Sequence, residues 1–310
     1  MKEITILELF GGIGALTKAF KNCGIPYRVV DYVEIDKYAT ASYNAMNDTN
    51  FEPQDICKWD KDIKVDLIMH GSPCQDFSIG GYQKSGDKNS GTRSSLMWET
   101  VRIVEKIKPK CVIWENVKNL LSEKHKHNFQ AYLDVMESLG YKNYYKVLNA
   151  KDYGLPQNRE RVFTISLLDN QTENNDDLSV FVNDFVFPDT KELKLCVKDL
   201  LEDNVDDYFY KVCPSMIRAL EDKKVKDITN SKYCNTLTTK QARWNNAGMI
   251  VDNKGIRYIT GKEAFRFMGF DDEDYDKASR CCSLIQIYKQ AGNSIAVNVL
   301  EAILKNLIRS

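Results

Sequence analysis

A thiol, a carboxyl group and two guanidinium groups each stand at the boundary of a predicted strand. They are Cys74, which lies in a Gly-Ser-Pro-Cys-Gln turn, Glu115, and the closely spaced pair Arg159 and Arg161. A thiolate can add to an electron-poor carbon, and a carboxyl group and guanidiniums can balance the charge that develops as it does so. These groups are the parts that covalent attack on a pyrimidine ring requires.

Each of these groups also has an ordinary structural interpretation. A single cysteine is more often an inert buried residue than a nucleophile, a lone glutamate more often caps a helix or forms an ion pair, and arginines are often surface charges. The setting of Cys74 favours chemistry, because Pro73 restricts the turn and ligands bind at the carboxyl ends of parallel strands. Several such groups at the strand boundaries of one sheet rarely coincide by chance.

The elements that must position these groups alternate between β-rich runs and helical patterns. Strands are predicted at residues 4–10, 28–34, 65–70, 111–115, 144–149 and 161–168, and helices at residues 13–20, 37–47, 98–106 and 129–139. This alternation predicts an α/β fold with a mostly parallel sheet. The chain ends in a helix with an apolar stripe, which predicts that it packs back on the first domain.

A change in character marks a second, smaller domain. Between residues 188 and 260 the periodicity is weak and turn residues are frequent. We therefore expect a catalytic and cofactor-binding domain at residues 1–187, completed by residues 261–310, and a smaller domain at residues 188–260.

Composition limits the class of protein. No apolar run approaches the roughly 18–20 residues of a membrane span, and the start does not resemble a signal peptide, so we expect a cytoplasmic protein without a membrane partner. Nine cysteines without a CxxC pair, and three histidines that form no cluster with them, indicate neither a disulfide framework nor a metal site. The net charge of −1 neither supports nor excludes nucleic-acid binding.

The glycine-rich segment at residues 10–14 links the first strand to the first helix, a position where a ligand can approach the backbone. Glu34, at the end of the second strand, can accept hydrogen bonds from ribose hydroxyls, and Asp55 is placed to meet an adenine amino group. A dinucleotide site prefers Gly-x-Gly-x-x-Gly, but Thr17 occupies the third glycine position. The pattern therefore favours a smaller adenosyl ligand over NAD.

Five motifs in order resemble those of the C5-cytosine DNA methyltransferases of the bacterial and phage single-chain type. They are Phe-Gly-Gly-Ile-Gly at residues 10–14, Gly-Ser-Pro-Cys-Gln at 71–75, Glu-Asn-Val at 115–117, Gln-Asn-Arg-Glu-Arg at 157–161 and Gly-Asn-Ser at 292–294. The similarity covers about residues 3–170 and 260–308. It implies a Rossmann-like methyltransferase fold, S-adenosylmethionine as cofactor with S-adenosylhomocysteine as product, and a target-recognition domain at residues 188–260.

The resemblance also implies a role for each reactive group. Cys74 would add to C6 of cytosine so that C5 becomes nucleophilic, and Glu115 would contact N3 and the exocyclic amine. Arg161 would hold the O2 side of the ring, with Arg159 supporting it. The cytosine would have to be flipped out of a specific short sequence in duplex DNA.

Cofactor and DNA contacts follow from the same resemblance. The implied cofactor residues are Phe10, Gly14, Glu34, Ile35, Asp55, Ile56, Pro73, Leu96 and Asn293. Ile35 departs from the family, because an aromatic residue commonly occupies this position and stacks on the adenine. The polar segment 75–95 is predicted to be a lid over DNA, with contacts from Gln75, Ser78, Lys84 and Arg93. Thr236 is aligned by the family pattern, and Gln241 and Arg243 are the side chains in its vicinity best suited to reading bases.

Other interpretations remain open at this point. A tRNA cytosine methyltransferase of the same superfamily would carry a Cys-Phe-Thr tripeptide in its recognition region, which this chain does not have. A catalytically silent DNA-binding paralogue would normally have lost Cys74, Glu115 or Arg161. A small-molecule dehydrogenase is disfavoured by Thr17. We expect a monomer, and neither the DNA target nor a partner restriction enzyme, nor a phage origin, can be read from the chain.

Overall fold

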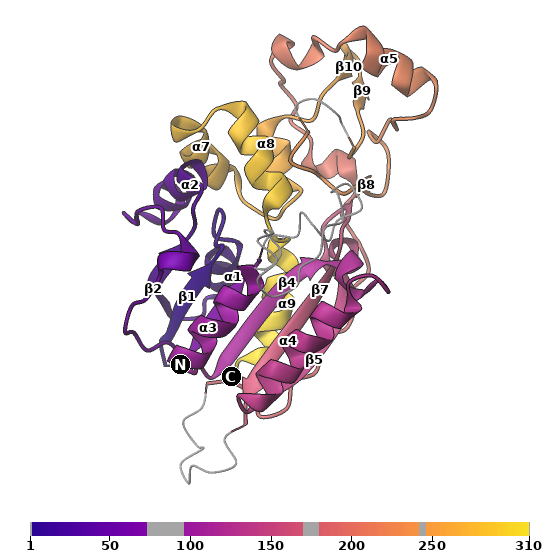
Figure 1. The fold of residues 1–310 in the computed structure, drawn as a ribbon. Helices are drawn as coiled ribbons and strands as arrows, with labels where there is room; N and C mark the ends of the chain where they lie inside the picture. Colours follow the sequence, from indigo (N-terminus) through magenta and orange to yellow (C-terminus); the bar gives the residue numbers. More distant parts are fainter. Residues whose placement is uncertain (1, 73–95, 170–179, 242–245, 310) are drawn as a thin grey trace.

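The computed structural model describes residues 2–72, 96–169, 180–241 and 246–309. Its centre is a six-stranded sheet with the strand order β2-β1-β3-β4-β7-β5 (Figure 1). The strands of this sheet are β1 (Ile4–Leu9), β2 (Tyr27–Val33), β3 (Leu67–His70), β4 (Cys111–Val117), β5 (Tyr141–Asn149) and β7 (Glu160–Leu168).

The sheet is mostly parallel, as predicted, and has one reversed strand. β1 pairs in parallel with β2 and β3, and β3 with β4. β7 lies antiparallel between β4 and β5. The amino end of β7 therefore lies at the same edge of the sheet as the carboxyl ends of β3 and β4.

Helices cover both faces of the sheet. In Figure 1, α3 (Met97–Ile107) and α4 (Lys126–Ser138) lie on the near face, and α9 (Val297–Leu307) lies behind it. Because side chains alternate along a strand, β1 supplies Ile4 and Ile6 to the core shared with α1 (Ala15–Cys23) and α9. Leu7 and Leu9 enter the core on the α3 and α4 side.

The C-terminal helix packs on the first domain, as predicted. Val299, Ile303 and Leu307 of α9 are buried in the same core as α1. Just beyond α9, Ile308 forms an antiparallel bridge with Phe181. The end of the chain therefore completes a layer that the first 170 residues leave open.

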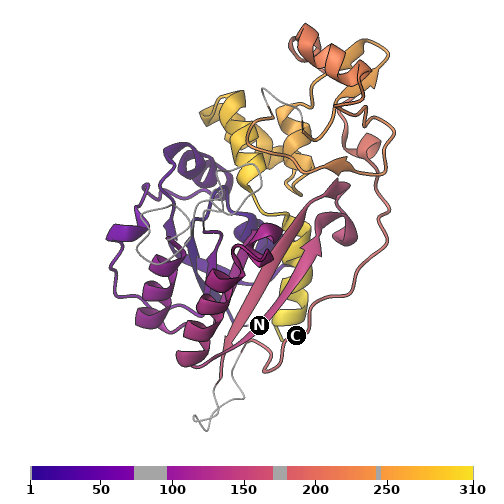
Figure 2. The same cartoon turned by 45° about the vertical axis from the view of Figure 1, so that its right-hand side comes forward.

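Residues 188–260, called the upper lobe below, extend beyond the carboxyl edge of the sheet (Figures 1 and 2). The lobe contains η6 (Val197–Leu200), η7 (Asp207–Tyr210), α5 (Pro214–Glu221), β8 (Cys234–Asn235), β9 (Ile250–Asp252) and β10 (Gly255–Arg257). It has a small core of its own in which Met216, Ala219, Val225 and Met249 are buried.

Four further helices are described, and Figure 1 labels most of them near the junction of the sheet with the upper lobe. They are α2 (Lys37–Asn47), α6 (Gly261–Arg266), α7 (Asp272–Cys281) and α8 (Leu284–Asn293), and the bounds of α2 are those predicted. Short elements complete the fold: η1 (Ile56–Lys58), η3 (Lys118–Leu121), η4 (Ala150–Tyr153) and β6 (Gln157–Asn158). β6 pairs with β8, so it joins the sheet region to the upper lobe.

Candidate active site

Three of the groups predicted to do chemistry, Glu115, Arg159 and Arg161, are described and act on one another at one edge of the sheet. β3 ends at His70 and β4 continues to Val117, whereas β7 begins at Glu160 and runs the opposite way. The register places Val117 opposite Arg161. The ends of two parallel strands therefore meet the start of β7, at the edge where open α/β sheets bind ligands.

Glu115 and Arg161 form an ion pair at this edge. Arg161 Nε lies 3.1 Å from Glu115 Oε1, and the two side chains are 17% and 11% exposed. Glu115 lies opposite Phe163, two residues from Arg161, so the pair is a diagonal contact on one face of adjacent strands. Arg161 Nη1 also donates a 2.8 Å hydrogen bond to the carbonyl of Glu160, which helps to fix the guanidinium.

Burial controls the protonation of Glu115. Removal from water raises the pKa of its carboxyl group, and the charges of Arg161 and Arg159 oppose that effect without cancelling it. A buried carboxyl group with a raised pKa can keep a proton closer to neutral pH and donate it. Glu115 is therefore a buried carboxyl group of raised pKa that a cation holds in place.

The chain that leads from β3 toward Cys74 is held beside this ion pair. A side-chain carbon on Gly71 would lie 3.8 Å from Glu115 Oε2. Buried Ser72 accepts a 3.1 Å hydrogen bond from Nε1 of Trp114, the residue before Glu115. The predicted residues Pro73, Cys74, Gln75, Ser78, Lys84, Arg93 and Arg243 lie outside the described residues.

Arg159 joins three backbone segments. Its guanidinium donates hydrogen bonds to the carbonyls of Leu237 at 3.0 Å, Gly292 at 3.0 Å and Ser294 at 2.6 Å. The side chain is buried, and its charge still acts on Glu115. An arginine whose donors are used in this way orients the site by connecting the upper lobe to the end of α8.

Residues next to Arg159 extend the same connection. Gln157 Oε1 accepts a 3.0 Å hydrogen bond from the backbone N–H of Leu237, and Nε2 donates to the carbonyl of Phe267 at 2.8 Å. The hydroxyl of Thr236 donates to the carbonyl of Asn158 at 2.7 Å. Thr236, which the family pattern assigns to DNA contact, therefore lies at the junction of β6 with the upper lobe.

Gly292 allows α8 to approach the upper lobe closely. A side-chain carbon at this position would lie 2.4 Å from the carbonyl carbon of Thr238 and 2.4 Å from the amide nitrogen of Thr239. Only glycine avoids that overlap. The following residue, Asn293, is exposed at the end of α8. This packing role was not predicted, although a glycine inside a helical pattern is a signal for it.

Gln241 has a buried side-chain amide that forms no hydrogen bond within the described residues. The residue is only 2% exposed. Among the described residues, neither the oxygen nor the nitrogen of its amide has a hydrogen-bond partner. Leaving a buried polar group unsatisfied costs about 1–3 kcal/mol. Within residues 2–72, 96–169, 180–241 and 246–309 the amide therefore has unused hydrogen-bonding capacity.

The glycine-rich loop between β1 and α1 adopts left-handed backbone conformations. The φ angles are +54° at Gly12 and +80° at Gly14, and Phe10 also has a φ of +54°. A side-chain carbon on Gly14 would lie 2.7 Å from the ring of Tyr43 in α2. The loop therefore depends on glycine both for its dihedral angles and for its contact with α2.

Glu34 faces this loop from the end of β2. Its Oε2 accepts a 3.1 Å hydrogen bond from the N–H of Gly12, and its Oε1 accepts a 2.9 Å bond from the N–H of Asp36. Burial raises the pKa of Glu34, although these amide donors lower it. The carboxyl group is thus fixed where a ribose carrying two hydroxyls can meet it.

The other described cofactor candidates differ in exposure. Ile35, next to Glu34, is 71% exposed, and Ile56 is buried. The carboxyl group of Asp55 accepts a hydrogen bond from a backbone N–H and so caps η1. Leu96 is partly buried and packs against the core near α3. Ile35 thus presents a large apolar surface beside the buried carboxyl group of Glu34.

Glu8 lies beneath the glycine-rich loop and was not predicted as a site residue. It accepts hydrogen bonds from the hydroxyls of Thr17 and Tyr43. Burial raises the pKa of Glu8 to about 7. A carboxyl group interrupting the apolar strand Ile4–Leu9 is the signal that could have identified it.

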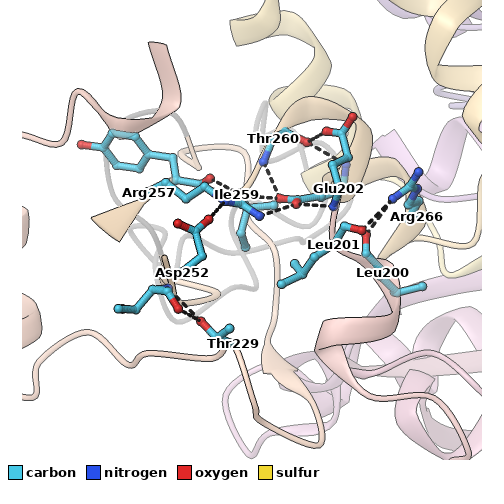
Figure 3. Close-up of polar contacts among 12 residues, drawn as sticks. Leu200, Leu201, Glu202, Thr229, Asp252, Arg257, Ile259, Thr260 and Arg266 are labelled. Atoms are coloured by element: carbon cyan, nitrogen blue, oxygen red, sulfur yellow. Dashed lines mark hydrogen bonds and ion pairs between the residues drawn. The ribbon is translucent and has the colours of Figure 1, made fainter. Parts of the chain in front are cut away.

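A buried ion pair fixes the upper lobe to α6. Arg257 donates to Glu263 through Nη1 at 2.9 Å and Nη2 at 2.8 Å, and to Asp252 through Nε at 3.0 Å. Figure 3 shows Arg257 and Asp252 together with Thr260, whose hydroxyl donates to Glu202. Because Arg257 and Glu263 are both almost fully buried, the orientation of β10 relative to α6 is closely specified.

Neither a membrane span nor a metal site is found among the described residues. None of their helices combines the length and the apolarity that crossing a bilayer requires. No group of three or more histidine, cysteine, aspartate or glutamate side chains in these ranges is placed to hold a metal ion.

Comparison with solved structures places the fold. The S. pombe Dnmt2 methyltransferase superimposes with a TM-score of 0.76 at 20% identity, covering 97% of this chain and 98% of that one. A putative DNA modification methyltransferase from an E. coli prophage gives a TM-score of 0.66 at 21% identity, covering 98% of both chains. At these identities the likeness shows the fold, which is that of the methyltransferases.

Comparison of sequences identifies the family. The C-5 cytosine-specific DNA methylase profile matches residues 4–309. The type II methyltransferase M2.ScrFI of Lactococcus lactis subsp. cremoris is 42% identical over 261 residues, covering 79% of this chain and 67% of the relative. The type II methyltransferase M.Bsp6I of Bacillus sp. (strain RFL6) is 33% identical, covering 99% of both chains. The chain therefore belongs to the C-5 cytosine-specific DNA methylase family and is a DNA cytosine-C5 methyltransferase.

Proposed function

We propose that this enzyme methylates C5 of a cytosine flipped out of a short specific sequence in duplex DNA, through a transient bond between the sulfur of Cys74 and C6. One observation carries the proposal: Glu115, with its raised pKa, is held by Arg161 directly beside the chain segment that leads to Cys74. A proton donor and a cation next to an incoming thiol suit addition to a neutral heteroaromatic ring.

The protein groups have separate tasks in this proposal. The Cys74 thiolate forms the bond to C6, and Glu115 gives its proton to N3 as the ring electrons move there. After C5 has taken the methyl group, C5 loses its proton to a base, the C5–C6 double bond forms again and the sulfur leaves with its electron pair. Glu115 then recovers the N3 proton. Arg161 orients Glu115 and the O2 side of the ring, while Arg159 acts by positioning.

S-Adenosylmethionine, when bound, supplies the methyl group, and S-adenosylhomocysteine is the product. The residues proposed to hold it are Phe10, Gly14, Glu34, Ile35, Asp55, Ile56, Pro73, Leu96 and Asn293. Two features of the chain fit this group: the fixed and buried carboxyl of Glu34 for the ribose hydroxyls, and the exposed Ile35 beside it for the adenine. An isoleucine provides dispersion contact without ring stacking.

The domain assignment belongs to the same proposal. Residues 1–187 and 261–310 would form the catalytic domain, and the upper lobe would recognise the DNA target. DNA would lie between them with its flipped base near Glu115. The remaining DNA contacts, from Gln75, Ser78, Lys84, Arg93, Thr236, Gln241 and Arg243, are proposed on the family pattern. We also propose that the enzyme is a monomer that works in the bacterial or phage-infected cytoplasm.

The test is transfer of labelled methyl groups to unmethylated duplex DNA, with tRNA offered in parallel. Cys74→Ala is expected to abolish transfer and leave cofactor binding intact. DNA with 5-fluorocytosine in the target is expected to trap a covalent complex, because fluorine cannot leave as a proton does. Bisulfite sequencing of DNA from expressing cells identifies the target.

Cys213→Ala is the matched control. Cys213 is exposed, and hydrogen bonding with Ser215 and its surroundings lowers the pKa of its thiol, which makes it a suitable cysteine to compare with Cys74. This variant is expected to retain both activity and trapping. Equal activity in Cys74→Ala, or transfer to tRNA and not to DNA, contradicts the proposal.

A further inference from the structure

A cavity of about 470 Å³ opens between the upper lobe and β6. One side is formed by the turn after α5, which contributes Lys223, Lys224, Val225 and Lys226, and the other side by Asn158, Asn235, Thr236, Thr238 and Asn246. Among these lining residues none is acidic. The lining therefore combines cationic groups with uncharged hydrogen-bonding groups.

The backbone of the lysine turn is fixed from its start. Lys223 has a φ of +58°, a left-handed conformation that costs a non-glycine residue energy. The turn is held by hydrogen bonds from the N–H of Lys223 to the carbonyl of Leu220 at 3.0 Å and from the N–H of Lys224 to the carbonyl of Ala219 at 2.9 Å. Such strain persists where the surroundings impose it, and it often marks a functional turn.

The turn is also fixed at its end. Val225 is buried in the small core of the upper lobe with Met249. The carbonyl of Lys226 accepts a 2.8 Å hydrogen bond from the N–H of Met249, and a side-chain carbon on Gly248 would lie 2.9 Å from that carbonyl oxygen. Three cationic side chains therefore emerge from a backbone that is ordered before any ligand arrives.

Ion pairs within the described part of the chain leave most of the charge of this turn available to a ligand. Lys224 Nζ lies 2.9 Å from Asp222, but both side chains are more than half exposed, so the pair is weak. Asp222 is not part of the cavity wall. A phosphate that displaces Asp222 would give Lys224 a charge-assisted hydrogen bond in place of a weak ion pair.

The opposite wall places the cavity next to the catalytic groups. Asn158 lies between Gln157 and Arg159 in β6, three residues before Arg161. Thr236 is bonded to the carbonyl of Asn158. The cavity is therefore lined in part by the segment that leads directly into Arg159 and Arg161.

We propose that Lys223, Lys224 and Lys226 form a preordered clamp for the phosphates that flank the flipped nucleotide. The clamp contributes affinity that is independent of sequence, because phosphates carry no base identity. This inference rests on the proposed function and adds to it the position at which the target-strand backbone is held. It assigns the three lysines to positioning of DNA and leaves base reading to other parts of the upper lobe.

The test measures binding of a random-sequence 30-base-pair duplex to the full chain over a range of salt concentrations. Each phosphate contact contributes about 0.9 to the slope of log K against log salt. K223Q/K224Q/K226Q is therefore expected to lower the slope by about two to three and to weaken cognate and random duplexes by the same factor. The control K2Q/K64Q/K146Q removes equal charge from exposed lysines of the catalytic domain and is expected to leave the slope nearly unchanged.

Four readouts decide the outcome. An unchanged slope overturns the clamp, as does an equal change in the control triple variant. Weakening confined to the cognate duplex also overturns it, because that result assigns the lysines to base reading. Cofactor binding and 5-fluorocytosine trapping by the wild-type protein report the proposed function separately. If trapping is intact but the slope does not change, the clamp is wrong and the enzyme assignment stands.

Discussion

The carboxyl group of Glu115 in β4 and the guanidinium of Arg161 in β7 form a largely buried diagonal pair, with Oε1 and Nε 3.1 Å apart. The pair combines two opposed effects. Burial raises the pKa of Glu115, whereas the cation lowers it and fixes the direction of the carboxyl group. The balance keeps the acid form accessible without leaving a buried carboxyl group unoriented.

Replacement of Glu115 tests this balance. Glu115→Gln keeps the size and shape of the side chain but removes its ionisable proton. Methyl transfer is therefore expected to fall by about 10²–10⁴-fold. Cofactor binding, measured by calorimetry, should not change. Glu160→Gln removes the same charge from an exposed residue of the neighbouring strand that pairs with Lys118, and it should retain nearly full activity. Full activity of Glu115→Gln would remove the acid role.

Glu8 predicts a pH dependence of stability. Burial raises its pKa from about 4.5 to about 7, so the folded protein keeps this proton to a higher pH than the unfolded chain does. Glu8 therefore lowers stability progressively as the pH rises through this interval, by about 3 kcal/mol at pH 8. Glu8→Gln, compared with wild type in urea unfolding, is expected to be more stable at pH 8 by up to that amount.

The same comparison at pH 4 provides the control for Glu8. Below its ordinary pKa the carboxyl group is protonated in both states, so the difference in free energy of unfolding between variant and wild type should nearly disappear. A difference of the same size at both pH values would mean that packing, and not ionisation, is responsible.

Gly292 predicts a steric effect at the junction of α8 and the upper lobe. Gly292→Ala places a carbon 2.4 Å from backbone atoms of Thr238 and Thr239, and backbone cannot move aside as a side chain can. We expect a loss of about 1–3 kcal/mol in the free energy of unfolding, together with weaker DNA binding. In the same helix Ile285 is 64% exposed, and Ile285→Ala should change stability by less than about 0.5 kcal/mol.

Gln241 predicts a separation of stability from function. Its buried amide has no hydrogen-bond partner among the described residues, so Gln241→Met should leave the free protein equally stable or more stable in thermal unfolding. If the amide contacts DNA, methyl transfer should nevertheless fall, through KM more than kcat. The contrast is Gln54→Met: Gln54 donates to Asp31 and to the carbonyl of Tyr32, and its loss should destabilise. Unchanged activity of Gln241→Met would exclude a DNA contact.

The sheet and its helices were largely predictable because their signals are local. The helix at residues 37–47 was predicted with its observed bounds, and β1 to β4 within two residues at each end. Alternating apolar runs and helical spacing express which face of each element is buried. The upper lobe was less predictable, since its elements are short and α5 and β8 depend on contacts distant in sequence. The acidic start of α7, with its capping box, was a local signal that was missed.

The candidate site can be proposed from the sequence as a set of residue types, whereas its arrangement cannot. The order of a turn cysteine, a strand-end glutamate and an arginine pair is enough to suggest covalent chemistry on a ring. Nothing in that order indicates that β7 enters the sheet in reverse between β4 and β5, and this reversal is what places Arg161 against Glu115. Strand pairing is a contact between distant segments, so local periodicity does not specify it.

The division between motif and fold is clearest for Arg159, which lies between β6 and β7, and Arg161, which lies in β7. They are two residues apart in the chain and look equivalent in the motif, yet Arg161 pairs with Glu115 and Arg159 donates to carbonyls of the upper lobe and the end of α8. Which chemistry is present follows from residue identity, because functional groups are a property of the chain. Which group faces the substrate and which one holds the framework follows from packing, because only folding brings those carbonyls within reach of Arg159.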